Sequence, residues 1–172
     1  LIEPMVPAIS QYEYRNKFEY SFTQTAEGPT LGFHRAGRWD EVMPVERCHL
    51  ATDCGNAVRE AAVSWARKSG LQAYDQKEHT GFLRHLVVRE GRHTGQVLTV
   101  LVTAPGALAD ADGFVEALCA VPEVEAVHWA INDRPAEVTN LPTELLWGVD
   151  VIEEEICGLR FRVRPNAFMQ TN

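Results

Sequence analysis

Residues 82–103 read FLRHLVVREGRHTGQVLTVLVT and decide the fold class. Two runs rich in apolar and β-branched side chains, 82–90 and 96–103, flank a turn that begins at Gly91 and ends at Gly95. Two such runs joined by a short glycine-containing turn are typical of a β-hairpin. The second run is almost continuously apolar, which predicts a central strand of the sheet.

Two helices are predicted around this hairpin. Residues 53–69 place their apolar side chains on a single stripe with helical spacing. Thr52 or Asp53 can cap the N-terminus of this helix, and Gly70 can end it. A second, shorter helix is predicted at about 112–120.

The remaining elements are strands, predicted from alternating or apolar patterns. They cover residues 15–24, 31–35, 40–45 and 124–132, followed by a hairpin of 151–156 and 159–164. Strands arranged in hairpins, with two helices between them, predict an α+β fold. We expect a mostly antiparallel sheet with both helices packed on one face, and the loop 105–113 as its most mobile connection.

Composition limits the classes of protein to consider. The 172 residues suffice for one domain with its own core, and no apolar run approaches the roughly 18 residues of a membrane span. The net charge of −8 argues against a free-standing nucleic-acid binder but permits a local basic face. The four scattered cysteines do not suggest a disulfide scaffold, so a reducing cytoplasm is expected.

Catalytic and phosphate-binding motifs are missing from the sequence. It contains no glycine-rich nucleotide loop, no HExxH and no GxSxG. Pattern alone therefore assigns no residue to catalysis. Together with the acidic charge, this favours a non-catalytic α+β binding or scaffold module, which is the alternative to the enzyme considered below.

Two short basic segments are candidates for RNA contact. Arg15 and Lys17 precede an aromatic strand, and basic groups beside aromatic rings suit backbone contact and base stacking. The same pattern also describes an exposed strand end above a buried aromatic face. Arg84 and His85 precede an apolar stretch and are placed either to meet a phosphate or to form a solvated strand edge. A regular strand would put Arg84 and Arg89 on opposite faces.

A third basic pattern lies in the last predicted hairpin. Arg160, Arg162 and Arg164 alternate with apolar residues, so the three guanidinium groups share one face. Like charges in a row require partners, and the glutamates 153–155 across the hairpin are favoured over phosphate.

Cys48 ends a predicted strand region and, as a lone cysteine, is expected to be a small buried hydrophobe. A zinc site that combines Cys48, His49 and Cys54 is disfavoured because no fourth ligand lies nearby.

Five segments together resemble RNA 5-methyluridine methyltransferases, the RNA uracil-5-methyltransferase family, in order and spacing. They are YRNK at 14–17, LGFHR at 31–35, VERC at 45–48, LRHLVVRE at 83–90 and FMQTN at 168–172. The resemblance covers nearly the whole chain. It implies an interior part of a larger enzyme: a central α+β domain at 1–165 and the start of a Rossmann-like methyltransferase domain at 166–172.

The resemblance also implies a function. The parent enzyme would use S-adenosylmethionine (SAM) to methylate C5 of a uridine, with its SAM loop, nucleophilic cysteine and general base beyond Asn172. No catalytic residue is then expected in this chain, which would help to dock RNA and be inactive alone. The implied partners are the missing catalytic domain and structured RNA, ribosomal RNA before tRNA, and no membrane. The residues expected to contact RNA are Arg15, Lys17, Arg84 and His85.

Three further residues match positions with a role in the family. Gln170 matches a glutamine that contacts SAM, and Phe168 matches an aromatic residue that lines the same pocket. Cys48 matches the fourth cysteine ligand of the four-iron–four-sulfur cluster found in many members. The other three ligands of that cluster would precede Leu1.

Overall fold

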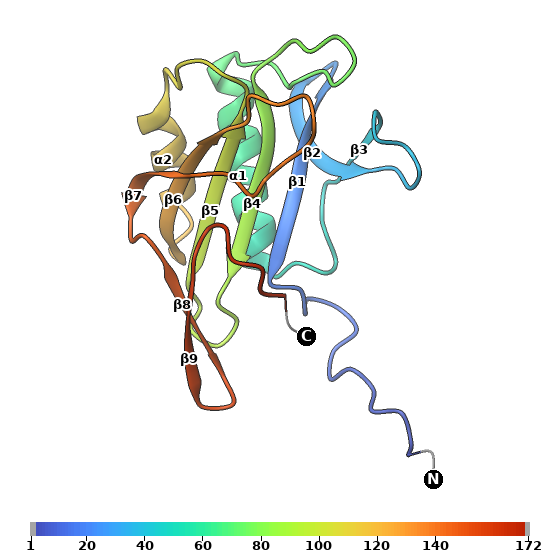
Figure 1. Ribbon diagram of the computed structural model, residues 1–172, viewed down its shortest axis with the longest axis vertical. Helices are drawn as coiled ribbons and strands as arrows, with labels where there is room; N and C mark the ends of the chain where they lie inside the picture. The colour runs from blue at the N-terminus through green and yellow to red at the C-terminus, as the bar shows by residue number, and fades with distance from the viewer. Residues whose placement is uncertain (1–2, 171–172) are drawn as a thin grey trace.

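The structure is a computed structural model that describes residues 3–170 (Figure 1). Thr171 and Asn172, the end of the last matched segment, lie outside the described residues. The strands are β1 (Lys17–Thr25), β2 (Gly28–His34), β3 (Val42–Pro44), β4 (Leu83–Glu90), β5 (Val97–Thr103), β6 (Val124–Ile131), β7 (Glu144–Gly148), β8 (Ile152–Ile156) and β9 (Leu159–Val163). The helices are α1 (Asp53–Ser69) and α2 (Ala111–Cys119).

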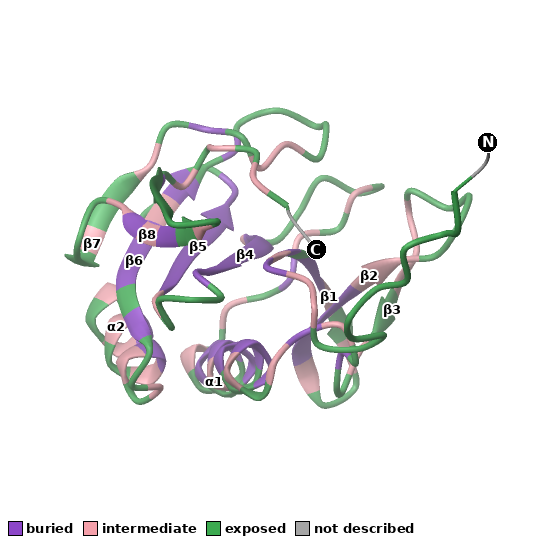
Figure 2. Ribbon diagram, turned by 90° about the horizontal axis from the view of Figure 1, so that it is seen from below, coloured by how far each residue is buried: buried purple, intermediate pink, exposed green. Residues whose placement is uncertain are grey.

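The described strands form a seven-stranded sheet, in the order β3-β2-β1-β4-β5-β6-β7, and a separate hairpin of β8 and β9. Neighbouring strands run antiparallel except β5 and β6, which are parallel and joined through α2. Both helices pack on one face of the sheet (Figure 2). The α+β fold expected from the sequence is therefore confirmed.

Apolar side chains are buried on both faces of the sheet. The larger cluster lies between sheet and helices and includes Tyr20, Leu86, Trp65 and Phe114. The smaller cluster, on the other face, joins Val87 and its neighbours to the root of the β8–β9 hairpin. Because complete burial of one large apolar side chain contributes about 1.5–3 kcal/mol, these two clusters hold the layers together.

Helix α1 begins and ends where its sequence predicts. The side chain of Thr52 accepts a hydrogen bond from the backbone N–H of Gly55 at 3.0 Å, which satisfies one of the free donors at the helix start. Gly70 ends the helix with φ of 72°, a left-handed conformation that glycine adopts without strain.

Strand β5 lies inside the sheet between β4 and β6, and all seven of its residues are buried, as its apolar run predicts. Strand β4, in the middle of the strand order, is also buried along all eight residues. The edge strand β7 was not predicted, because it exposes large apolar side chains, Leu145 and Trp147, instead of alternating them with polar ones.

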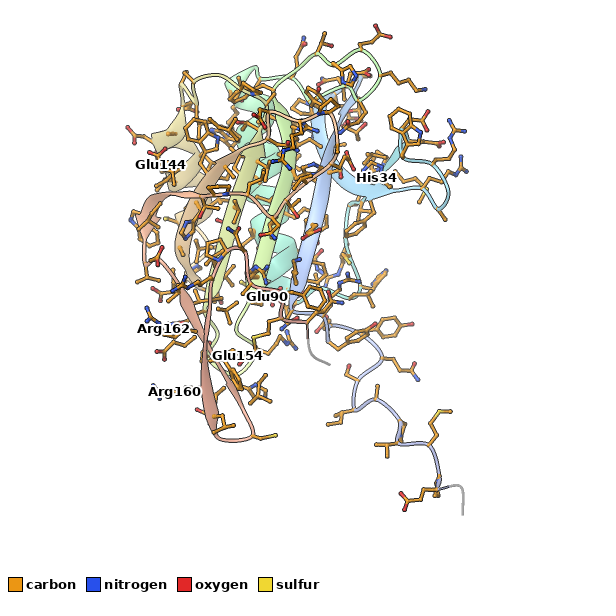
Figure 3. The ribbon with its side chains drawn as sticks, viewed as in Figure 1. His34, Glu90, Glu144, Glu154, Arg160 and Arg162 are labelled. Atoms are coloured by element: carbon orange, nitrogen blue, oxygen red, sulfur yellow. The ribbon has the colours of Figure 1, made fainter. Side chains whose placement is uncertain are left out.

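The β8–β9 hairpin extends away from the sheet and is attached through a buried carboxylate (Figure 3). Glu154 accepts hydrogen bonds from the backbone N–H groups of Arg92 at 2.6 Å and His93 at 3.0 Å. Burial raises the pKa of Glu154, but these N–H donors outweigh it and lower the pKa overall.

Cross-strand pairing of the arginines is also observed in this hairpin. Glu153 lies opposite Arg162, and Glu155 lies opposite Arg160. Arg160 Nη1 lies 3.4 Å from Glu153 Oε2. This ion pair is diagonal and exposed, so it contributes little to stability.

Among the residues that the structure describes, no helix is long and apolar enough to cross a membrane.

Candidate functional site

A cavity of about 460 Å³ opens where β1 begins. Its lining comes from β1 and the residues just before it, from β2, from the turn before α1 and from the segment that follows β9. The lining residues are Arg15, Lys17, Phe18, Glu19, Phe33, Cys48, Leu50, Phe168 and Gln170. Of the seven site residues predicted from the sequence, this cavity brings together Arg15, Lys17, Cys48, Phe168 and Gln170.

The position of Cys48 is fixed by the first turn of α1. The side-chain amide of Asn56 accepts a hydrogen bond from the N–H of Cys48 at 2.8 Å and donates one to the carbonyl of Cys48 at 3.1 Å. The same amide donates to the carbonyl of Thr52 at 2.9 Å. Asn56 thereby folds residues 48–52 against the helix, and Cys48 is left only 8% exposed at the wall of the cavity.

A lysine and an aromatic ring face each other across the cavity mouth. Lys17 Nζ lies 5.5 Å from the ring centre of Phe168, within the range of a cation–π contact. Lys17 also pairs with Glu19 at 2.5 Å. Burial raises the pKa of Glu19, but hydrogen bonds from Lys17 and Thr139 outweigh it and lower the pKa overall. Phe168 is 84% exposed, so its ring is available to a partner.

Arg89 lies beside this site, in an adjoining hollow that Lys17 and Phe168 also line. Arg89 lies directly opposite Lys17 in the pairing of β1 with β4. Its Nε donates to the carbonyl of Pro165 at 2.9 Å and so anchors the segment that carries Phe168. Burial lowers the pKa of Arg89. Only the register of the two strands reveals this neighbour, and no local pattern in the sequence encodes it.

Arg84 and His85 lie at the opposite end of β4 and are both 3% exposed. The guanidinium of Arg84 donates to four backbone carbonyls, those of Asn132, Arg134, Pro135 and Ala136, over 2.6–3.2 Å. His85 Nδ1 lies 3.3 Å from Ser21 Oγ. RNA contact by these two residues remains a prediction, and a direct contact would require them to leave these partners. Neither forms the solvated strand edge considered above, since the whole of β4 is buried.

No metal site is formed by residues 3–170, where no three His, Cys, Asp or Glu side chains are grouped to hold an ion. All four cysteines are free thiols. A four-iron–four-sulfur cluster is normally held by four cysteine thiolates. Cys48 is not grouped with the other three cysteines, so the described residues do not by themselves fit a cluster.

Comparisons with known proteins show which class of enzymes this fold and sequence resemble. No family model matches the chain. The crystal structure of the tRNA (uracil-54, C5)-methyltransferase of Pyrococcus abyssi, in complex with S-adenosyl-L-homocysteine, matches with a TM-score of 0.81 and 24% identity, over 97% of this chain and 39% of that one. At this identity the match establishes a shared fold.

Curated relatives add similarity in sequence. The tRNA (uracil(54)-C(5))-methyltransferase of Pyrococcus furiosus is 28% identical over 98% of this chain. An uncharacterized RNA methyltransferase of Caldanaerobacter subterraneus is 32% identical over 94% of it. The chain spans 38% and 37% of the lengths of these two relatives. The chain is therefore a relative of the RNA uracil-5-methyltransferase family, as the five matched segments predict.

Proposed function

We propose that this chain is the RNA-docking part of a SAM-dependent RNA (uracil-C5)-methyltransferase. The observation that supports the proposal most is the cavity at the start of β1, which gathers residues from four of the five matched segments. Similarity to RNA methyltransferases along 94–98% of the chain supports it further. The alternative of an unrelated scaffold module leaves this similarity unexplained.

We propose that catalysis is supplied by parts of the enzyme other than these residues. Methylation of uridine at C5 requires a thiolate that adds to C6 of the base. Burial raises the pKa of Cys54 to about 12 and also raises that of Cys119, so both are poor thiolates at neutral pH. Cys48 is buried in the cavity wall. This chain then docks RNA without activating the uridine.

Phe168 and Gln170 are proposed to meet SAM when the cofactor is bound. SAM supplies an electrophilic methyl group. The exposed ring of Phe168 suits stacking or cation–π contact with the planar and cationic groups of the cofactor. The amide of Gln170, exposed at the rim of the cavity, suits a hydrogen bond that orients it.

The proposed substrate is structured RNA, with tRNA as the first candidate. The relatives whose names specify a substrate are tRNA methyltransferases, so they give no support to the expected preference for ribosomal RNA. A cytoplasmic location is proposed as well. Cys48 enters this proposal only as a cavity residue, because an iron–sulfur cluster would need three further thiolates and no step here depends on one.

The first expected result is that the protein alone transfers no methyl group. Incubated with labelled SAM and unmodified tRNA, it should incorporate no label above background, while a full-length relative incorporates label under the same conditions. The reason is that, in this proposal, the nucleophile and the rest of the catalytic centre belong to other parts of the enzyme. Incorporation of label at uridine C5 by this chain would contradict the division of roles.

The second expected result concerns the basic side chains at the cavity. Replacing Arg15 and Lys17 together by Ala should weaken tRNA binding about tenfold and should make the affinity less dependent on salt, because each lost phosphate contact lowers the salt slope by about one unit. Filter binding at two salt concentrations measures both quantities. The matched control is Arg160→Ala with Arg162→Ala on the distal hairpin, which should change neither. Equal losses in both double variants would place RNA contact elsewhere.

A further inference from the structure

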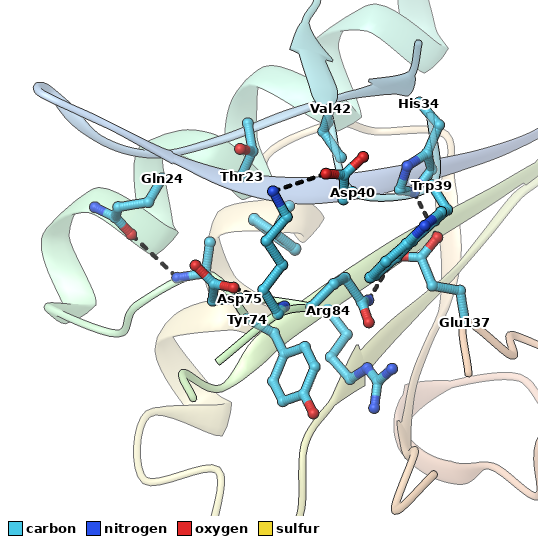
Figure 4. Close-up of a pocket in the computed structure, with 14 residues that line it drawn as sticks. Thr23, Gln24, His34, Trp39, Asp40, Val42, Tyr74, Asp75, Arg84 and Glu137 are labelled. Carbon is cyan, nitrogen blue, oxygen red and sulfur yellow. Dashed lines mark hydrogen bonds and ion pairs between the residues drawn. The ribbon is translucent and has the colours of Figure 1, made fainter. Parts of the chain in front are cut away.

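A second cavity, of about 230 Å³, lies at the far end of β1 (Figure 4). Three loops surround it: residues 35–41 between β2 and β3, residues 70–82 between α1 and β4, and residues 132–143 between β6 and β7. None of the site residues that meet at the start of β1 lines this cavity. Along β1, residues 17–19 line the first cavity and residues 22–24 line the second, on average five positions further on. At about 3.3 Å per residue, the two linings are therefore about 17 Å apart along the strand.

The three loops are held together by polar contacts between their side chains. Lys77 Nζ lies 2.7 Å from Asp40 Oδ2, which joins the first loop to the second. Gln76 Nε2 donates to Glu137 Oε1 at 2.6 Å, which joins the second loop to the third. Glu137 also pairs with His34 at the end of β2. The cavity is therefore organised before any ligand enters, which reduces the entropy lost on binding.

Trp39 stands on the rim of this cavity and is 67% exposed. The surface hollow continues past Trp39 to His79 and Pro135. Tryptophan is seldom left so exposed, and it is enriched among the residues that dominate binding interfaces. An exposed indole beside a preformed polar cavity provides a stacking surface for a flat ligand.

The charges in the cavity disfavour a phosphate. Three carboxylates line it, those of Asp40, Asp75 and Glu137, and each already accepts hydrogen bonds from protein donors. His34 Nδ1 is buried without a hydrogen-bond partner among the described residues. A neutral, planar group with both donors and acceptors on its edge fits these surroundings better than an anion. An RNA base has this chemistry.

A catalytic role for His34 and Glu137 of this cavity, with the neighbouring Ser21, is not favoured. Ser21 Oγ lies 3.1 Å from His34 Nε2, and the carboxylate of Glu137 meets the same nitrogen. A relay through imidazole requires the acid and the nucleophile on different ring nitrogens. Ser21 is also only 5% exposed.

We propose that this second cavity binds an unpaired base of structured RNA, stacked on Trp39, while the cavity at the start of β1 contacts the RNA elsewhere. The inference rests on the proposed function, which it extends to a second docking point. Two points of contact about 17 Å apart select a folded RNA over a short single strand, because each fixes the position of the other.

The test compares Trp39→Ala with Trp39→Phe in tRNA binding. Trp39→Ala should weaken binding about tenfold, as expected for the loss of one stacked base, and Trp39→Phe should retain most of the affinity. The matched control is Trp147→Ala, which removes another half-exposed tryptophan on the edge strand β7 and should change nothing. Circular dichroism and thermal melting verify that each variant is folded.

A second measurement identifies the chemistry of the ligand. Free ribonucleosides should quench a part of the tryptophan fluorescence that is missing in Trp39→Phe, whereas inorganic phosphate should not. Quenching by phosphate alone would overturn the proposal of a base site. If wild type binds no tRNA, the proposed function fails together with this inference. If the Arg15 and Lys17 variant loses affinity while Trp39→Ala binds as wild type does, only the inference fails.

Discussion

Replacing Arg84 by Ala should lower the free energy of unfolding by about 3 kcal/mol, since a hydrogen bond from a charged donor contributes about 1.5–3 kcal/mol and the losses are not additive. Arg84 is 3% exposed and donates to four carbonyls of the loop between β6 and β7. Its guanidinium also lies 4.3 Å from the ring centre of Tyr74. Ala would remove the donor that these carbonyls share, of which that of Asn132 is buried.

Urea unfolding followed by circular dichroism measures this loss. Arg84→Lys keeps the charge but lacks the planar fork, so it should recover only a minor part of the stability. Arg35→Ala, an exposed arginine paired with Glu41 at 2.8 Å, serves as the matched control and should change stability by less than about 1 kcal/mol. A stability of Arg84→Ala equal to that of wild type would show that these four bonds contribute nothing net.

The loop that Arg84 organises also carries Glu137, which lines the second cavity. We therefore expect Arg84 to affect RNA binding indirectly, because it positions the loop that lines the second cavity. The expectation that Arg84 and Arg89 face opposite ways assumes a regular strand, but the pairing of β4 with β5 shifts register between Leu83 and His85, at Arg84. A bulge of this kind redirects side chains, and a single sequence does not reveal it.

Local patterns in the sequence predicted those parts of the fold that local physics determines. The apolar stripe and both ends of α1 are examples, since a cap, a stripe and a terminal glycine all act within a few residues. The hairpin of β8 and β9 is another, since the alternation of Arg160 and Arg162 fixed their partners across a short turn.

Non-local pairing determined what the sequence did not predict. Lys17 and Arg89 are neighbours because β1 pairs with β4, across 72 positions of sequence. The second cavity likewise depends on three loops far apart in the chain, and its acidic and aromatic residues form no motif in any one of them. Such sites follow from strand order and register, which a single sequence specifies only weakly.

The stability of the protein should fall steeply in acid because of His85. Burial, with smaller contributions from Arg84 and His34 and against an opposing one from Glu19, lowers the pKa of His85 to about 3 from a usual 6.5. The folded state therefore keeps this imidazole neutral, while the unfolded chain takes up a proton below pH 6.5. The contribution to stability is complete above pH 6.5 and is lost as the pH falls towards 3.

The expected loss from His85 alone is about 2 kcal/mol between pH 7 and pH 5, since each pH unit below the unfolded pKa costs about 1.4 kcal/mol. Urea unfolding at half-unit steps of pH measures it. His85→Gln can still hydrogen-bond to Ser21. It should reduce the slope of the unfolding free energy against pH by up to about 1.4 kcal/mol per pH unit, which corresponds to one proton. Burial also lowers the pKa of His128, so some dependence of the unfolding free energy on pH should remain in His85→Gln. The control His49→Gln replaces an exposed histidine and should keep the wild-type slope. An unchanged slope in His85→Gln would show that His85 is protonated in the folded protein, in conflict with its burial between β1 and β5.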